Sequence, residues 1–190
     1  VKLLETTLTI NPDCVAVAEM KGAESMQAIN AANTGHSVIT TIHANSCADT
    51  YYRMVTLCKQ SYDMDDATLM GLATKAFPVV AFAKKLEDNS RRIMEISECE
   101  YVGDAASGES HRRMRTLYRF HITDNQTVDG KARLIGHYER VEPPSEGLLK
   151  RLRENGMCLR AQQELFGVGK EGFGEPCCVE KAVPVTGDAG

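Results

Sequence analysis

The sequence predicts an α/β fold with a mainly parallel sheet and an antiparallel hairpin near its carboxyl end, and one observation supports each part of this prediction. Short apolar runs alternate with helical patterns over residues 14–83, in the order strand, helix, strand, two helices, strand. Such alternation is typical of a parallel sheet whose strands are joined by helices. After residue 90 the pattern changes to strand-like segments separated by turns, which predicts antiparallel pairing near the carboxyl end.

The first three elements are expected between residues 14 and 42. Residues 14–18, CVAVA, form a continuous apolar run, which is typical of a strand buried on both faces. Residues 23–33 repeat apolar side chains at helical intervals, and Gly35 is placed to end this helix in a left-handed conformation. Residues 37–42 are rich in β-branched side chains and predict the second strand.

Two helices and a third strand are expected next. Ser46 can cap one helix, and Asp65 can cap another. Both helices carry apolar residues on one stripe. Phe77-Pro78 ends the second helix, since the residue before a proline disfavours helical geometry. Residues 79–83 are the predicted third strand.

The second half of the chain predicts strands and then a short helix. Residues 91–101 and 116–123 have strand patterns, and the turn Asp129-Gly130 leads into 131–140, which predicts a hairpin. Ser145 can cap a short helix that Asn155-Gly156 ends. We therefore expect a domain over 1–141, a helical appendage over 142–167 and a flexible, Gly/Pro-containing tail over 168–190.

Composition excludes several classes of protein. The net charge of −4 argues against a chain that coats nucleic acid or an anionic membrane, so no nucleic-acid partner is expected. The seven cysteines are an odd number and lack C-x-x-C spacing, which predicts free, buried thiols of a cytosolic protein. The adjacent pair Cys177 and Cys178 stands apart as a candidate redox pair within the tail.

Two polar residues follow the first two predicted strands directly. Glu19 follows the first strand and His43 follows the second. Ligands of open α/β sheets bind outside the carboxyl ends of the strands, so these residues could face one crevice. A carboxylate there can orient water or help to hold a metal-bound phosphate, and an imidazole can hydrogen-bond a phosphate. Alternatively, Glu19 begins a solvated loop and His43 only ends a strand.

A metal site shared by the two histidines of this region is not expected. His36 and His43 stand at opposite ends of one predicted strand. Seven residues at ~3.3 Å each place them roughly 23 Å apart, so that one ion cannot bind both.

Four stretches together resemble the type II/type IV secretion and pilus-assembly ATPases. Residues 12–46, PDCVAVAEMKGAESMQAINAANTGHSVITTIHANS, resemble the Walker B and histidine-box region of that family. RRIMEISE, 91–98, resembles a stretch that follows the core strands. Residues 117–140 and 148–167 resemble the end of the tight-adherence (Flp) pilus branch. The resemblance spans about residues 2–167.

The resemblance implies a RecA-like P-loop NTPase core that is truncated on its N-terminal side. It further implies an ATP-hydrolysing motor subunit that powers pilus assembly or type II/IV secretion, with ATP and Mg²⁺ as cofactors. The family works as a hexamer at an inner-membrane platform protein. The implied location is cytoplasmic, peripheral to the inner face of the membrane.

Several residues match functional positions of the family. Glu19 matches the Walker B glutamate, the water-orienting base and a ligand of Mg²⁺ through water. His43 matches the histidine that senses nucleotide. The other matched positions, which imply nucleotide binding or a subunit boundary, are Asp13, Lys21, His36 and Arg53.

The sequence also departs from the family pattern. Ala18 replaces a glycine, and Lys21 replaces an arginine, although lysine is a point charge without a planar fork. G-x-x-x-x-G-K-[ST] does not occur, and GVGKEG at 167–172 reads as linker. We expect the phosphate loop upstream of Val1, and the 190-residue chain alone to bind ATP weakly or not at all. Two alternatives remain. One is a catalytically incomplete assembly module. The other is a thiol or metal protein, although the scatter of the cysteines argues against it.

Overall fold

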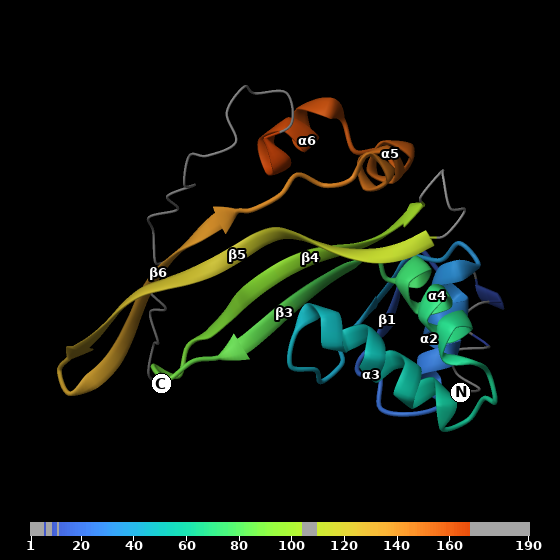
Figure 1. Cartoon of the computed structure of the whole chain (residues 1–190), viewed down its shortest axis with the longest axis horizontal. Coiled ribbons are helices and arrows are strands. Elements are labelled where there is room, and N and C mark those ends of the chain that lie inside the picture. Colours follow the sequence, from blue (N-terminus) through green and yellow to red (C-terminus); the bar gives the residue numbers. More distant parts are fainter. Residues whose placement is uncertain (1–5, 7–8, 11, 104–109, 168–190) are drawn as a thin grey trace.

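The computed structural model describes residues 6, 9–10, 12–103 and 110–167. Helices α2 to α4 gather at one end of the molecule, and a long second sheet crosses it (Figure 1). In chain order the elements are β1 (Val15–Val17), α2 (Glu24–Asn33), β2 (Val38–Thr40), α3 (Cys47–Lys59), α4 (Asp66–Ala76), β3 (Val79–Lys85), β4 (Arg91–Gly103), β5 (Ser110–Val128), β6 (Lys131–Arg140), α5 (Glu146–Glu154) and α6 (Leu159–Phe166).

The strands form two separate sheets, and the prediction of a mainly parallel sheet is wrong. Strands β1 and β2 pair in parallel, whereas β3-β4-β5-β6 form an antiparallel sheet in that order. The physical reason is the length of the connections. Only residues 86–90 join β3 to β4, while a parallel crossover needs a dozen residues or more.

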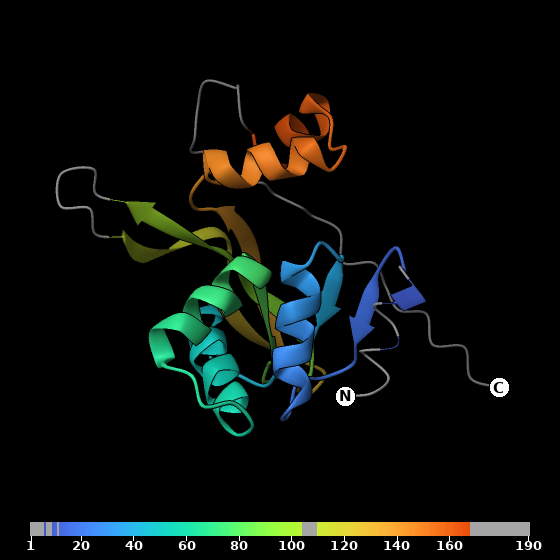
Figure 2. The ribbon, with the colours of Figure 1, turned by 90° about the vertical axis from the view of Figure 1, so that its right-hand side faces the viewer.

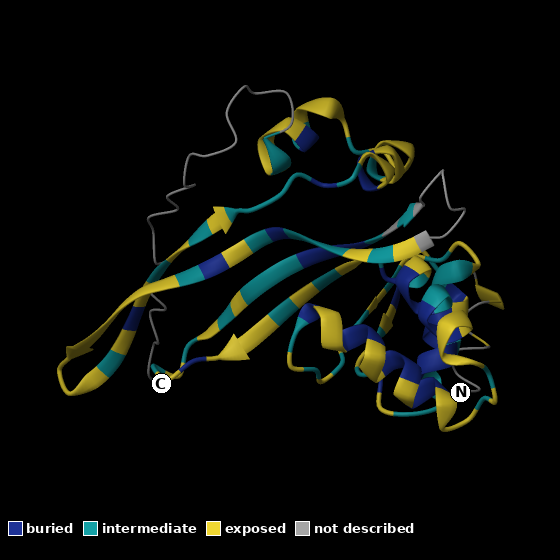
Figure 3. Ribbon diagram, in the orientation of Figure 1, coloured by how far each residue is buried: buried dark blue, intermediate teal, exposed yellow. Residues whose placement is uncertain are grey.

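The predicted hairpin is confirmed, although its strands are longer than expected. Asp129 and Gly130 both have positive φ, 51° and 72°, as a two-residue hairpin turn requires. Strand β5 begins at Ser110 rather than at 116, and it pairs with both β4 and β6. Beyond its pairing with β4, the β5–β6 hairpin continues as a largely exposed arm (Figure 3).

Local signals placed α2, α3 and α4 correctly. The Ser46 side chain accepts a hydrogen bond from the Asp49 N–H at 3.0 Å, and Asp65 accepts one from Thr68 at 2.9 Å. Gly35 follows α2 with φ of 103°. The apolar stripes of these helices form the main core (Figure 3), which includes Met26, Ile29, Tyr51, Met54, Leu57, Leu69 and Ala73.

Strand β1 is covered on one face only, so the prediction of a strand buried on both faces is wrong. Val15 is buried and Val17 packs against the helical core, but Ala16 between them is exposed. Its pairing partner on β2, Ile39, is also 63% exposed. Among the described residues, α2 to α4 bury only one side of the β1–β2 sheet, because no described element covers the other side.

The C-terminal region holds two helices where one was expected. Ser145 caps α5 by accepting from the Leu148 N–H at 3.1 Å, as predicted. The second helix, α6, packs beside it, with the Gln162 side chain donating to the Leu149 carbonyl oxygen at 3.0 Å. Figures 1 and 2 show this pair separated from α2 to α4 by the antiparallel sheet.

The limits of 1–141 and 142–167 stay predictions, and the predicted tail over 168–190 lies outside the described residues. Within the part of the chain that is described, no helix combines the length and the apolar character that a membrane crossing needs.

Gly136 is expected to be essential for the stability of the hairpin. A Cβ atom at this position would lie 2.2 Å from the His121 carbonyl oxygen and 2.6 Å from the Phe120 ring. We predict that Gly136→Ala lowers the free energy of unfolding by about 1–3 kcal/mol, measured by urea denaturation. Gly147→Ala is the matched control, because its Cβ meets nothing closer than 3.6 Å. Equal stability of the two variants would contradict the prediction.

Candidate functional site

The pairing of β1 with β2 brings their carboxyl ends together. Val17 lies opposite Thr40 in the parallel register. The pairing continues past the strands, since the Met20 N–H donates to the Thr41 carbonyl oxygen at 2.8 Å. The Thr41 hydroxyl also donates to the Ala18 carbonyl oxygen at 2.6 Å. These two bonds hold the segments that follow β1 and β2 side by side.

Glu19 and His43 meet at this rim, as their positions in the sequence predicted. His43 Nε2 lies 3.3 Å from Glu19 Oε1. On the other side of the carboxylate, Lys21 Nζ lies 2.9 Å from Glu19 Oε2. The side chain of Glu19 is only 26% exposed, whereas those of Lys21 and His43 are 70% and 94% exposed. A half-buried carboxylate therefore stands between two solvent-facing nitrogen groups.

The electrostatics of the rim follow from this arrangement. The hydrogen bond to Glu19 and the charge of that carboxylate raise the pKa of Lys21 above its ordinary value. A second carboxylate, Glu24, fixes the loop itself by accepting from the backbone N–H groups of Lys21 at 2.5 Å and of Gly22 at 2.9 Å. The hydrogen bond from the Lys21 N–H is the main reason that the pKa of Glu24 is lowered.

The other matched residues do not share the rim. Asp13 and His36 precede β1 and β2, at the opposite ends of the two strands, where the Val15 N–H bonds the Ser37 carbonyl oxygen at 2.8 Å. Neither ring nitrogen of His36 has a hydrogen-bond partner among the described residues. Arg53 lies on the exposed surface of α3. Nucleotide contacts by Asp13, His36 and Arg53 therefore stay predictions.

A slot of about 460 Å³ opens beside the rim, between β2 and β3. Residues 39–44, which include His43, line one side, and residues 79–83 of β3 line the other. Within the described part of the chain, β2 pairs only with β1 and β3 pairs only with β4. Each strand therefore presents an unpaired edge to the slot.

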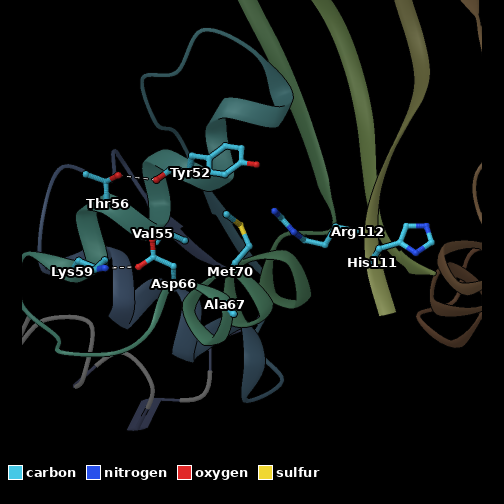
Figure 4. Close-up of a pocket in the computed structure, with 9 residues that line it drawn as sticks. All are labelled: Tyr52, Val55, Thr56, Lys59, Asp66, Ala67, Met70, His111 and Arg112. Atoms are coloured by element: carbon cyan, nitrogen blue, oxygen red, sulfur yellow. Dashed lines mark hydrogen bonds and ion pairs between the residues drawn. The ribbon is translucent and has the colours of Figure 1, made fainter. Parts of the chain in front are cut away.

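A separate hollow of about 540 Å³ lies between α3, α4 and the start of β5 (Figure 4). The Arg112 side chain points into it from β5, with its guanidinium carbon 5.7 Å from the centre of the Tyr52 ring. At the far end Lys59 pairs with Asp66. None of the functional positions inferred from the sequence resemblance lines this hollow. We therefore take the rim as the candidate site.

The rim offers a divalent cation one carboxylate. No group of three or more His, Cys, Asp or Glu side chains suited to a metal ion occurs among the described residues. This donor set fits Mg²⁺, which is usually held by one or two carboxylates together with water and substrate phosphates. It does not fit a protein cage for zinc, which needs three or four side-chain ligands.

Comparison with known proteins decides the family. Residues 1–156 match the family described as "Type II/IV secretion system protein". The chain belongs to the type II/IV secretion system protein family. The resemblance seen in the Walker B and histidine-box region is thereby confirmed at the level of the family.

Individual relatives of this family match shorter regions. The protein transport protein HofB homolog of Haemophilus influenzae is 35% identical over 75 residues, 39% of this chain and 16% of its own. The type IV pilus assembly ATPase PilB of Pseudomonas aeruginosa is 29% identical over 94 residues, 49% of this chain and 16% of its own. The type IV secretion system protein VirB11 of Bartonella henselae is 28% identical over 90 residues, 45% of this chain and 25% of its own.

Among solved structures, the VirB11 ATPase of the Brucella suis type IV secretion system, in complex with sulphate, is 28% identical with a TM-score of 0.48. That match covers 51% of this chain and 31% of the VirB11 chain. The matched regions thus span no more than about a third of each of these relatives.

Two residues that shape the rim were missed at the sequence level. Thr41 ties the two segments together through its hydroxyl, and Glu24 fixes the loop that carries Lys21. A signal existed for Glu24, because an acidic residue in the first turn of a helix commonly accepts from free backbone N–H groups. Thr41 gave none, since a threonine in a strand is ordinary.

The five cysteines that the structure describes are free thiols, but the prediction that they are buried is wrong for two of them. Among those described, Cys47, Cys58 and Cys99 are buried, whereas Cys14 and Cys158 are exposed. Cys177 and Cys178 lie outside the described residues. Burial raises the pKa of Cys47 to about 12, helped by the charge of Glu95, and burial raises that of Cys58 to about 11.

Alkylation by iodoacetamide should follow this pattern. At pH 8 only about one in 10,000 Cys47 thiols is ionised at its raised pKa, and the thiolate is the nucleophile. We expect mass spectrometry to find Cys14 and Cys158 modified and Cys47 and Cys58 protected, until guanidinium unfolds the chain. Alkylation of Cys47 in the folded protein at the rate of Cys14 would contradict this expectation.

Proposed function

We propose that the full-length protein is an ATP-hydrolysing motor subunit that powers pilus assembly or type II/IV secretion. This chain would then be the part of a RecA-like core that contains the Walker B and histidine-box strands, β1 and β2. The observation that carries the proposal is the contact between Glu19 and His43 at the carboxyl ends of two parallel strands. Nucleotides bind at that end of open α/β sheets.

In this proposal Glu19 is the catalytic base. Its carboxylate would orient the attacking water and help to hold Mg²⁺, and the bound ion would neutralise charge on the phosphates. His43 senses the terminal phosphate by donating a hydrogen bond from its exposed imidazole. Two groups at fixed positions on one rim supply the positioning that phosphoryl transfer chiefly requires.

The slot between β2 and β3 supports a site that further polypeptide completes. Its two unpaired strand edges and its apolar lining suit an additional extended strand. A strand that ran parallel to β2 there would end at the rim, beside His43. We infer that the loop after such a strand provides the backbone N–H groups and the lysine that cradle the phosphates.

The partners of the proposed motor follow from the same assignment. Relatives are named as a type IV pilus assembly ATPase and as a type IV secretion system protein. We infer that the full-length protein acts as a hexamer, in the cytoplasm at the inner face of the membrane. There it would engage a membrane platform protein of the secretion or pilus system. Arg53, exposed on α3, would face the neighbouring subunit.

A second candidate is a catalytically incomplete module that keeps the fold and binds partners. One observation favours it, because both oxygens of Glu19 are engaged, by Lys21 and by His43. The Ala18 and Lys21 departures from the family pattern point the same way. Such a module would show no hydrolysis whatever residue stands at position 19.

A Glu19→Gln variant of the full-length protein separates the two candidates. It keeps the size and polarity of the side chain but removes the base. We predict that ATP hydrolysis falls about 100- to 10,000-fold, while the affinity for a non-hydrolysable ATP analogue changes by no more than about threefold.

Glu154→Gln is the matched control. It makes the same chemical change at an exposed residue of α5 that pairs with Lys150, so hydrolysis should stay at the wild-type rate. Unchanged hydrolysis in the Glu19→Gln variant would show that Glu19 is not the base and would refute the motor proposal.

A further inference from the structure

We propose that Lys21 is a positioning residue that holds Glu19 while the site is empty and releases it when a phosphate arrives. The ammonium group would leave the carboxylate for the terminal phosphate of the bound nucleotide. The proposal rests on the proposed motor function and adds the regulation of its base. Lys21 would thus pair with the Glu19 carboxylate in the empty site and with the terminal phosphate in the occupied site.

In this structure each oxygen of the Glu19 carboxylate has a nitrogen group beside it. Lys21 Nζ lies 2.9 Å from Oε2, and His43 Nε2 lies 3.3 Å from Oε1. A carboxylate accepts a proton or binds a cation through the lone pairs of these same oxygens. These contacts hold Glu19 in place, and the ammonium charge of Lys21 disfavours a second cation such as Mg²⁺ at the same carboxylate.

The backbone of Lys21 is held in place, whereas its exposed side chain can change partner. Its backbone is fixed, because Glu24 accepts from the N–H groups of Lys21 and Gly22 at 2.5 and 2.9 Å. Its side chain is 70% exposed on a flexible four-carbon stem, and it contacts Glu19 only through the terminal ammonium group. Ion pairs between exposed groups are weak and are readily exchanged for another partner. Glu19 is less mobile, at 26% exposed.

A phosphate is the ligand chemistry that this cation fits. Lysine binds phosphate as a point charge, without the two-pronged geometry that arginine would impose. A terminal phosphate carries more negative charge than one carboxylate, so it competes well for the ammonium group. Within the described chain, the ion pair with Glu19 is the contact that holds the Lys21 side chain. If the Lys21 ammonium group moved to the phosphate, the Glu19 carboxylate would therefore lose this partner when the nucleotide binds.

The first test measures Mn²⁺ binding to the nucleotide-free, full-length protein, with electron paramagnetic resonance reporting the unbound ion. Lys21→Met removes a positive charge that opposes a cation at Glu19, so we expect Mn²⁺ affinity to rise about tenfold. Lys21→Arg keeps the charge and should bind Mn²⁺ as the wild type does. The Glu19→Gln/Lys21→Met double variant should lose the gain.

Lys59→Met is the matched control, because Lys59 also pairs with a carboxylate, but with that of Asp66 instead of Glu19. It removes the same charge, so it should leave Mn²⁺ affinity unchanged. A tenfold rise in this variant as well would show a general charge effect and would overturn the assignment to Lys21.

The second test measures nucleotide affinity by calorimetry, without turnover. Lys21→Met should weaken a non-hydrolysable ATP analogue about tenfold more than it weakens ADP, because only the former presents the terminal phosphate. Wild-type Mn²⁺ affinity in this variant would refute the holding role. Equal losses for the two nucleotides would refute the transfer to phosphate.

These outcomes are distinct from failure of the motor proposal. If Glu19→Gln abolishes hydrolysis while Lys21→Met matches the wild type in both binding tests, the motor stands and the switch is wrong. If Glu19→Gln keeps hydrolysis, the function itself is wrong, and the switch, which rests on it, falls with it.

Discussion

The parallel register of β1 and β2 is the constraint on which the candidate site depends. Val17 lies opposite Thr40, and bonds from Met20 and Thr41 carry the alignment beyond the strands. A slip of one residue would move one partner by ~3.3 Å along the strand and turn its side chains to the other face. The contact between Glu19 and His43, at 3.3 Å, would not survive such a slip.

The register explains why the charges at the rim are organised around one carboxylate. Glu19 is the least exposed of the three interacting groups, and its two chain neighbours, Ala18 and Met20, are both hydrogen-bonded to Thr41. Lys21 and His43 reach it from opposite directions with exposed side chains. A partly buried carboxylate with exposed nitrogen groups beside it can be neutralised or unmasked without any change in the fold.

Much of the helical layer could be predicted from the sequence because its signals are local. Ser46 and Asp65 both cap helices through their own side chains, and Gly35 ends α2 with positive φ. The direction of strand pairing could not be predicted in the same way, because an apolar run such as 79–83 does not reveal which strand it will pair with. The α6 helix was missed because it is only eight residues long and because Cys158, the residue before it, supplies no side-chain cap.

The candidate site was predictable in position but not in detail. The positions of Glu19 and His43 directly after two strands made their meeting possible, since parallel strands end at one edge, but did not show that these two strands are neighbours. Spacing could not show that Lys21 would occupy the second carboxylate oxygen, because the side-chain torsions of a lysine are not set by its sequence position. Asp13 and His36, in turn, lie at the opposite ends of the same strands because each precedes one.

The contact between Glu19 and His43 can be measured most directly by a carbon-edited nuclear Overhauser experiment on the isotopically labelled protein. We expect cross-peaks between the imidazole protons of His43 and the side-chain protons of Glu19. Cross-peaks between paired residues of β1 and β2, such as Val17 and Thr40, should accompany them. Register cross-peaks without any between His43 and Glu19 would show that the strands pair but that the two side chains do not meet. That result would contradict the site on which the proposed function rests.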